Sequence, residues 1–292
     1  MISLREIRQK IKSVRSIRKI TQTMKMVATA RLKRAYGRIV DSRPFAQKLE
    51  AMAAELVGRV NLEKTNDNLL QFFLPAPGRQ EAFLLLTSDK GLCGSFNTSL
   101  FRNLIPQLAE TPAPFLIVVG KKGRNYLKHN NYPIYQEHLD LWLKLSFAQA
   151  EVLGEELMEL YLRKKLSAVK IIYNQFVSPI SQKPVIKILL PLAAPTVKDN
   201  KIEYRRQPKN YTDYLYEPGK EKVLSALIPR YIKSEIYRAL LESYASELGA
   251  RMNAMDNATK NADEMINALT LTLNKIRQAN ITQELAELMQ TE

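Results

Sequence analysis

The chain has 292 residues, and its 44 Lys and Arg against 29 Asp and Glu give a formal net charge of +15. This excess predicts an acidic partner, such as a nucleic acid, an anionic membrane surface or acidic loops of another protein. The single cysteine, Cys93, excludes an internal disulfide framework and fits a reducing compartment. No apolar run is long enough to span a membrane.

Residues 3 to about 57 are predicted to form a first long helix. Its start lacks the apolar core of a signal peptide, and its unbroken periodicity favours a mature helix over a transit peptide. Pro44 marks either a kink or a short break from which the helix restarts. The expected buried stripe consists of Leu4, Ile7, Ile11, Val14, Ile17, Ile20, Met24 and Val27, continued by Ala28, Ala30, Leu32, Ala35 and Ile39.

This first helix is strongly basic. Between Arg5 and Arg43 it carries thirteen Lys or Arg residues against two acidic ones, Glu6 and Asp41. A solvated polar face is the ordinary explanation for charged residues on a helix. Here the imbalance carries a cost in self-repulsion that ordinary solvation does not explain. We therefore expect something acidic alongside this helix.

Residues 69–200 are predicted to form a small Rossmann-like α/β domain around a largely parallel sheet, because short apolar strands alternate with helical segments. Pro75, Pro77 and Gly78 form its entry hinge. The predicted strands are 82–87, 115–119, 169–173 and 185–190, and the predicted helices are 97–109, 123–129 and 147–166.

Residues 201–292 are predicted to hold a foot loop and a second long helix. The helix starts near Lys222 or at Pro229, a residue suited to a first helical turn, and continues to the C-terminus. The loop is rich in tyrosines that either pack on the helix or face a partner: Tyr204, Tyr211, Tyr214 and Tyr216.

The second helix carries a heptad repeat kept for six heptads, which is typical of a coiled coil because only a 3.5-residue repeat keeps facing one partner. Both long helices enter the domain at one end, so we expect an antiparallel pair made by residues 1–68 and by the helix of 201–292. The last turns of the longer helix then lack a partner but stay apolar, which predicts a socket in another protein. The seam positions are Leu241, Ala245, Leu248, Met252, Met255, Thr259, Ala262, Ile266, Leu269, Leu273, Ile276 and Asn280.

No catalytic constellation is found in the sequence. His129 and His138 belong to no cluster with zinc spacing, and a P-loop is absent. Residues 91–94 and 120–123 are Gly-containing segments after two predicted strands. They are interpreted as tight turns, with nucleotide or anion binding as the alternative. Cys93 is interpreted as a turn or core thiol.

Two further groups in the domain have structural interpretations. Trp142 is either a packing residue or an edge contact. The acidic residues of the third predicted helix are interpreted as a solvated face, and they are Glu151, Glu155, Glu156 and Glu159.

Several blocks of the chain resemble the γ subunit of F-type ATP synthases. They are 7–35, TSDKGLCGSFN at 87–97, DYLYEP at 213–218, ARMNAMDNATKNADEMI at 250–266 and NKIRQANITQELAEL at 274–288. They occur in the family's order and span nearly the whole chain. The resemblance implies a central-stalk rotor without a catalytic site or cofactor. Its implied partners are a ring of α and β subunits around the coiled coil, the ε subunit beside the α/β domain, and the c-ring.

The resemblance also implies contacts with other subunits. Toward an acidic lever of the β subunit the basic helix would present Met24 and Lys25, and its charge adds Arg31 and Arg34 as subunit contacts. Toward a β-subunit catch loop the tip would present Leu273, Arg277, Gln278, Thr282 and Glu284, although the family often has an aromatic residue at 273. Toward the c-ring the foot would present Tyr214, Tyr216 and Glu217.

The end of the chain, LMQTE, departs from the Gly/Ala-rich tail common in the family, which leaves the tip contacts less defined. The start at Met1 without a presequence suggests a bacterial protein, peripheral on the cytoplasmic side of the inner membrane. The alternatives are a basic coiled-coil protein that binds nucleic acid, and an α/β enzyme with a helical dimerisation arm. The first lacks a platform of stacked aromatic and basic residues, and the second lacks a site.

Overall fold

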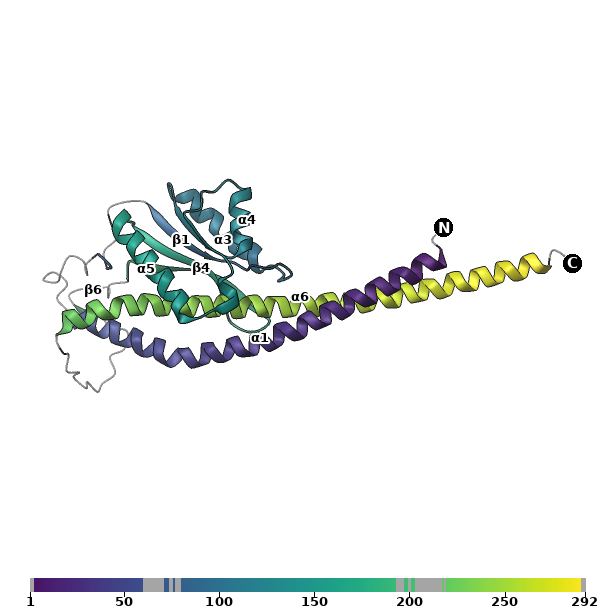
Figure 1. The fold of residues 1–292 in the computed structure, drawn as a ribbon, viewed down its shortest axis with the longest axis horizontal. Coiled ribbons are helices and arrows are strands. Elements are labelled where there is room, and N and C mark those ends of the chain that lie inside the picture. Colours follow the sequence, from purple (N-terminus) through teal and green to yellow (C-terminus); the bar gives the residue numbers. More distant parts are fainter. Residues whose placement is uncertain are drawn as a thin grey trace.

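The computed structural model describes residues 3–59, 71–73, 76, 80–192, 197–198, 201–202, 217 and 219–289. Two long helices, α1 (Leu4–Arg59) and α6 (Lys220–Met289), run in opposite directions side by side, and an α/β domain packs against one end of the pair (Figure 1). The predicted architecture is therefore confirmed. The predicted domain boundaries after residues 68 and 200 lie outside the described residues, as does the proposed hinge at Pro75, Pro77 and Gly78, and they stay predictions.

The first helix is continuous. At its start the Ser3 N–H donates to Glu6 Oε2 at 3.0 Å and the Glu6 N–H donates to Ser3 Oγ at 3.3 Å, which forms a capping box. Pro44 lies inside the helix, so the predicted alternative of a break is wrong. Figure 1 shows α1 as a long bow whose N-terminal part runs along α6 beyond the domain.

The α/β domain is built on a five-stranded sheet with the order β3-β2-β1-β4-β5. The strands are β1 (Glu81–Leu86), β2 (Phe115–Val119), β3 (Gln136–His138), β4 (Ala168–Phe176) and β5 (Gln182–Leu190). The first four pair in parallel, and β5 runs antiparallel to β4. The prediction of a largely parallel sheet is thus confirmed. A short ribbon of β6 (Val197–Lys198) and β7 (Lys201–Ile202) follows.

Helices cover both faces of this sheet. On one face lie α3 (Phe96–Glu110) and α4 (Lys121–His129), and on the other lie α5 (Phe147–Lys164) and α6. Because neither face meets water, β1 and β2 are nearly continuous apolar runs.

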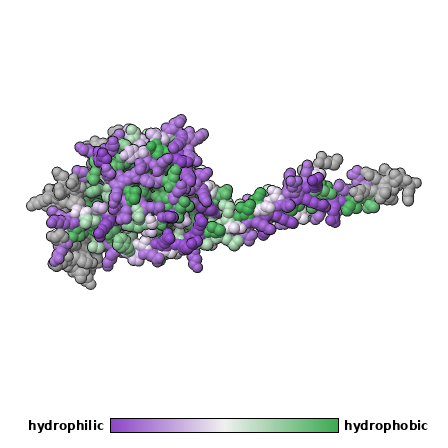
Figure 2. Space-filling view, viewed as in Figure 1, coloured by the Kyte–Doolittle hydropathy of each residue, from purple (hydrophilic) through white to green (hydrophobic). Residues whose placement is uncertain are grey.

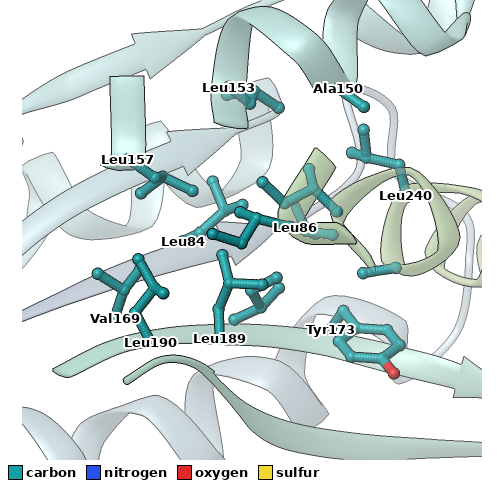
Figure 3. Packing of buried hydrophobic residues seen from close by; sticks show 14 of the residues in the cluster. Leu84, Leu86, Ala150, Leu153, Leu157, Val169, Tyr173, Leu189, Leu190 and Leu240 are labelled. Carbon is teal, nitrogen blue, oxygen red and sulfur yellow. The ribbon is translucent and has the colours of Figure 1, made fainter. Parts of the chain in front are cut away.

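The long helix α6 is part of the domain core. Leu84 and Leu86 of β1 pack in one cluster with Ala150 of α5 and Leu240 of α6, as Figure 3 shows. The alternate residue Leu85 packs on the opposite side, against α3 and α4. The helix α6 is therefore held to the domain by the same apolar burial that holds the sheet together.

The structure differs from the sequence prediction in short elements and at the start of α6. It adds the edge strand β3 and the 3-10 helix η2 (Leu141–Lys144), whose short segments carry no apolar repeat. It starts α6 at Lys220, close to the predicted Lys222. Pro229 lies inside α6, so the prediction of Pro229 in the first turn is wrong.

Candidate interaction surface on the paired helices

The heptad seam predicted on α6 is confirmed. Every seam position from Leu241 to Ile276 is buried or half-buried, while most residues between the seam positions beyond Met255 are exposed. Asn280, the last position of the series, is exposed. The seam therefore faces α1 only up to a point near the end of the chain.

The stripe predicted on α1 is wrong in its middle. The side chains of Ile17, Ile20 and Val27 are exposed by 50%, 59% and 46%. They form a second apolar row beside the true seam. The predicted stripe residues that are buried are Ile7, Ile11, Ala28, Leu32, Ala35 and Ile39.

Polar side chains occupy the true seam where the predicted stripe fails. Arg18 forms an ion pair with Asp263 of α6. One heptad along, Lys25 Nζ donates to Asp256 Oδ1 at 2.5 Å, and Lys260 Nζ lies 3.0 Å from the other carboxylate oxygen. Hydrogen bonds from Lys25 and Lys260 lower the pKa of the Asp256 carboxyl. Part of the acidic neighbour predicted for the basic helix is thus α6 itself.

The register of the two helices follows from these contacts. Between the two ion pairs the hydroxyl oxygens of Thr21 and Thr259 lie 2.8 Å apart. The ion pairs are seven residues apart on both helices. Two more heptads in the same antiparallel register place Leu4, the first residue of α1, opposite Arg277. The rest of α6, from Gln278 to Met289, extends past the start of α1.

The tip of α6 is an exposed helix with apolar side chains. Leu271, Ile281 and Leu285 are exposed by 64%, 46% and 57%. Figure 2 shows hydrophobic and hydrophilic residues mixed along the projecting helices, whereas hydrophilic residues dominate the visible face of the domain. The predicted lack of a helix partner for the last turns is confirmed for the described residues.

The structure brings the predicted tip contacts onto one short segment. Leu273 is half-buried on the seam, and Arg277 and Gln278 are exposed. Thr282 is exposed, and its hydroxyl donates to the Gln278 carbonyl at 2.9 Å. Glu284 lies on the same helix, but its side chain is outside the described residues.

The other predicted contacts lie far from the tip. On α1, Arg31 and Arg34 are exposed and Met24 is half-buried beside the paired Lys25. The foot residue Glu217 is exposed. Tyr204, Tyr211, Tyr214 and Tyr216 lie outside the described residues, so the two interpretations of the tyrosine cluster stay open.

Two loops of the α/β domain are tied to α6 just below the polar part of the seam. Arg251 Nη2 donates to the carbonyls of Lys90 and Gly91, both at 3.2 Å, in the loop after β1. Its Nη1 pairs with Glu247 at 2.5 Å. Burial raises the pKa of the Glu247 carboxyl, and the Arg251 charge opposes that rise. A charged residue of α6 thus fixes the loop after β1.

The turn between β4 and β5 forms the second tie. Asn253 Nδ2 donates to the Pro179 carbonyl at 2.9 Å. Gly249 lies so close that an added Cβ would meet the same Pro179 oxygen at 2.9 Å. Glycine is therefore required at 249 for the turn to approach the helix.

The edge of the sheet where α/β folds bind ligands is covered by α6 here. In this strand order the connections change direction between β1 and β4, and open sheets bind ligands at that point. Ser246 Oγ of α6 donates to the Asn174 carbonyl at the end of β4, at 2.8 Å. The Asn174 side chain donates to the Phe96 carbonyl at 2.9 Å. The Ser246 bond ties the domain to α6, and the Asn174 side chain joins β4 to α3.

The Gly-containing segment after β1 forms a tight turn, as predicted, whereas after β2 only Gly120 precedes α4, so the interpretation of 120–123 as a turn is wrong. Gly94 and Gly120 have φ values of 57° and 97°, and a Cβ on Gly120 would meet the Thr87 carbonyl oxygen at 2.2 Å. Cys93, in the first turn, is a buried free thiol whose pKa is raised by burial. Trp142 is buried and donates to the Thr87 carbonyl at 2.8 Å, which confirms its packing role.

The acidic row of α5 is not simply a solvated face, which corrects the sequence interpretation. Glu156 Oε2 lies 2.9 Å from His138 Nε2 of β3, with both side chains about four-fifths buried. Glu155 pairs with Lys233 of α6 at 2.8 Å. A cavity of about 680 Å³ opens beside the His138–Glu156 pair. Its lining contains no nucleophile beside a base that would suggest catalysis.

Within the described ranges, no cluster of three or more His, Cys, Asp or Glu side chains could hold a metal ion. In the same part of the chain, no helix is both long and apolar enough to span a membrane.

Comparisons with known proteins agree along the whole chain. A family model described as ATP synthase matches residues 3–291. A curated ATP synthase gamma chain from Moorella thermoacetica is 39% identical over 290 residues, which cover 99% of this chain and 98% of that one. One from Anaeromyxobacter dehalogenans is 41% identical over 293 residues, with the same coverage.

Solved structures give the same picture. A chain of the Tetrahymena thermophila mitochondrial ATP synthase, from a structure of the central stalk and c-ring, is 29% identical with a TM-score of 0.60. The match covers 82% of this chain and 99% of that one. A chain of the Euglena gracilis mitochondrial ATP synthase rotor, at 24% identity, shares the fold with a TM-score of 0.67, over 95% of this chain and 98% of that one.

Proposed function

The chain belongs to the ATP synthase gamma-chain family, and from this premise we propose that it is the central-stalk rotor of such a complex. In this role it couples ion flow through a membrane c-ring to ATP synthesis or hydrolysis at a ring of α and β subunits. The observation that carries the proposal is the apolar tip of α6, which extends past the start of α1. A helix with Ile281 and Leu285 exposed fits a protein sleeve better than water.

The shape of the chain suits a shaft. Two helices packed along a seam resist twisting more than one helix does. The pair is also lopsided, since α6 outreaches α1 and the basic residues lie mainly on α1. Three equivalent β subunits around such a shaft would each face a different surface. Each angle of rotation could then stabilise a different conformation at each site, which is the differential interaction that coupling requires.

We assign the contacts with the ring to two levels of the shaft. At the lower level, Arg31 and Arg34 are exposed cations that an acidic lever of the β subunit would meet, with Met24 and Lys25 beside them. At the tip, a β-subunit catch loop would meet the segment that carries Leu273, Arg277, Gln278, Thr282 and Glu284.

At the opposite end we assign the c-ring contact to the foot, with Tyr214, Tyr216 and the exposed Glu217. The ε subunit would pack beside the α/β domain. Such a chain is held at the membrane through its partners. We propose a peripheral place on the cytoplasmic side of a bacterial inner membrane.

As a gamma chain, the protein is one subunit of an ATP synthase complex, and we propose that it contributes no catalytic residue. The ligand edge of its sheet is covered by α6, and its only cysteine is a buried turn thiol. The nucleotides would bind in the surrounding ring. The chain then affects catalysis only through its angle of rotation within the ring.

Co-expression tests this proposal directly. The α and β chains of one bacterial complex are expressed with and without this chain, and the purified assemblies are assayed for ATP hydrolysis. Strong hydrolysis is expected only when this chain is present, and it should copurify with the ring. Equal activity with and without it, or failure to copurify, would contradict the rotor role.

Nucleic-acid binding, the alternative from the sequence, finds no support in the comparisons. Two of the basic residues that suggested it, Arg18 and Lys25, are paired within the chain to Asp263 and Asp256. Retention on DNA that falls steeply with salt would revive this alternative.

A further inference from the structure

The seam between α1 and α6 has three parts of different chemistry. The lower arm pairs residues 28–39 of α1 with 241–252 of α6, and the upper arm pairs residues 4–14 with 266–276. Between them lies what we call the polar band, residues 18–25 of α1 and 256–263 of α6. Within the band the inward positions of α1 are Arg18, Thr21 and Lys25.

Apolar packing holds the lower arm. Its inward side chains on α1 include Ala28 and Leu32, exposed by 2% and 6%. On α6 they include Leu241, Ala245 and Leu248, exposed by 2% or less. The α/β domain also packs on this part of α6 and excludes water from the seam.

Apolar packing returns in the upper arm without help from the domain. Ile7 and Ile11 of α1 are exposed by 2% and 6%. Opposite them in the register lie Leu273 and Leu269, both half-buried. The upper arm is thus a short apolar coiled coil of its own, separated from the lower arm by the polar band.

The polar band is held by partly exposed charges around one small buried apolar side chain, Ala262. The side chains of the Arg18–Asp263 pair are exposed by 41% and 47%, and those of the Lys25–Asp256 pair by 41% and 31%. Ion pairs this exposed add little net stability and weaken as salt rises. By contrast, the burial of aliphatic side chains adds more net stability and is not screened by salt. Adhesion between the two helices is therefore weakest, and most dependent on salt, in the band.

We infer that the polar band is a joint in the shaft, where the two helices part and pair again more readily than in either arm. Lys25 and Lys260 share the Asp256 carboxylate, so that carboxylate keeps one cation while the other moves. The joint rests only on contacts within this chain. Its use, to let the tip lean or twist relative to the domain, rests on the proposed rotor function.

Amide hydrogen exchange of the full-length chain at low and high salt tests the joint. Peptides covering the polar band should exchange about two- to fivefold faster at high salt, the range expected when exposed ion pairs are screened. Peptides from either arm should respond much less. Equal salt responses in the band and the lower arm would overturn the inference.

A pair of matched double variants sharpens the test. Arg18→Leu with Asp263→Leu replaces one ion pair of the band by aliphatic side chains and should reduce the salt response there. Arg15→Leu with Glu264→Leu makes a similar change at exposed positions outside the seam and should leave it unchanged. Equal effects of the two variants would contradict the joint.

The proposed function and the inference of a joint can each be refuted without the other. Loss of copurification with the ring would remove the rotor role but leave the exchange pattern intact. A uniform exchange pattern would remove the joint and leave the rotor role untouched.

Discussion

The two ends of α6 belong to one unbroken helix but have opposite surroundings. Around Leu240 the helix packs on β1, α5 and the wider core, and that side chain has no exposed surface. Around Leu285 the same kind of side chain is 57% exposed. The comparison teaches that apolar residues on one helix can serve two purposes. At one end they anchor the shaft to its domain, and at the other they form a surface for a different protein.

Charged groups follow the same division. At the domain end, Lys187 of β5 pairs with Glu235 of α6, whose side chain is only 3% exposed. Nearby, burial raises the pKa of Glu242 and that of Tyr173. At the tip, Arg277 and Gln278 are exposed. Lys187 and Glu235 are therefore committed to an internal pair, while Arg277 and Gln278 are accessible to a partner.

Truncating each leucine tests this comparison with the largest expected effect. Leu240→Ala should lower the free energy of unfolding by about 2–5 kcal/mol, because it leaves a cavity in the core. Leu285→Ala should change it by less than about 0.5 kcal/mol, as exposed substitutions usually do. Chemical denaturation of both variants measures the difference. Similar losses would mean that the two ends are packed alike.

Removing the tip separates folding from assembly. A chain that ends after Asn280 should unfold like the parent, since the deleted turns lie past the start of α1. It should copurify with the α and β ring at least roughly tenfold less, because each lost leucine or isoleucine contact is worth on the order of 1.5–3 kcal/mol. Leu285→Ala serves as the milder companion. Undiminished copurification would show that the tip is not needed to bind the ring.

Reversing charge on α1 tests the lower level of contact. Changing Lys25, Arg31 and Arg34 together to glutamate should weaken coupling between hydrolysis and ion pumping, since an acidic lever would be repelled. The readout is ATP-driven pumping in vesicles relative to hydrolysis, with the reversal of exposed Lys10 and Lys12 as the control. Pumping that survives the triple change intact would refute the charge argument.

Acid titration gives the smallest effect and probes the polar band. The pKa of Asp256 lies below its usual value because Lys25 and Lys260 donate to it. Its ion pairs therefore add stability above the ordinary pKa of about 3.9 and lose it as pH falls through the lowered one. Asp256→Asn should lower the Tm slightly near neutral pH, and the difference should vanish once the pH falls below the lowered pKa. Asp41→Asn, at an exposed position on α1, is the control.

The sequence pattern located the seam on α6 but misplaced its middle part on α1, for one physical reason. Ile17, Ile20 and Met24 recur at helical spacing, and so do Arg18, Thr21 and Lys25, each one residue further along. A prediction from hydrophobicity alone selects the first row as the buried one. The second row faces inward because acidic residues of α6 lie opposite it, and that pairing depends on a register that neither helix specifies alone.

By itself, the sequence determined the long helices, the seam on α6, the alternating α/β domain and the family, because each depends on local spacing or on continuous blocks of residues. Only the tertiary structure decided which row of α1 meets α6, and that α6 covers the ligand edge of the sheet. It also decided how far the tip extends past α1 and that His138 pairs with Glu156. These features join residues far apart in the chain, and their energies depend on a packing geometry that spacing along one segment does not contain.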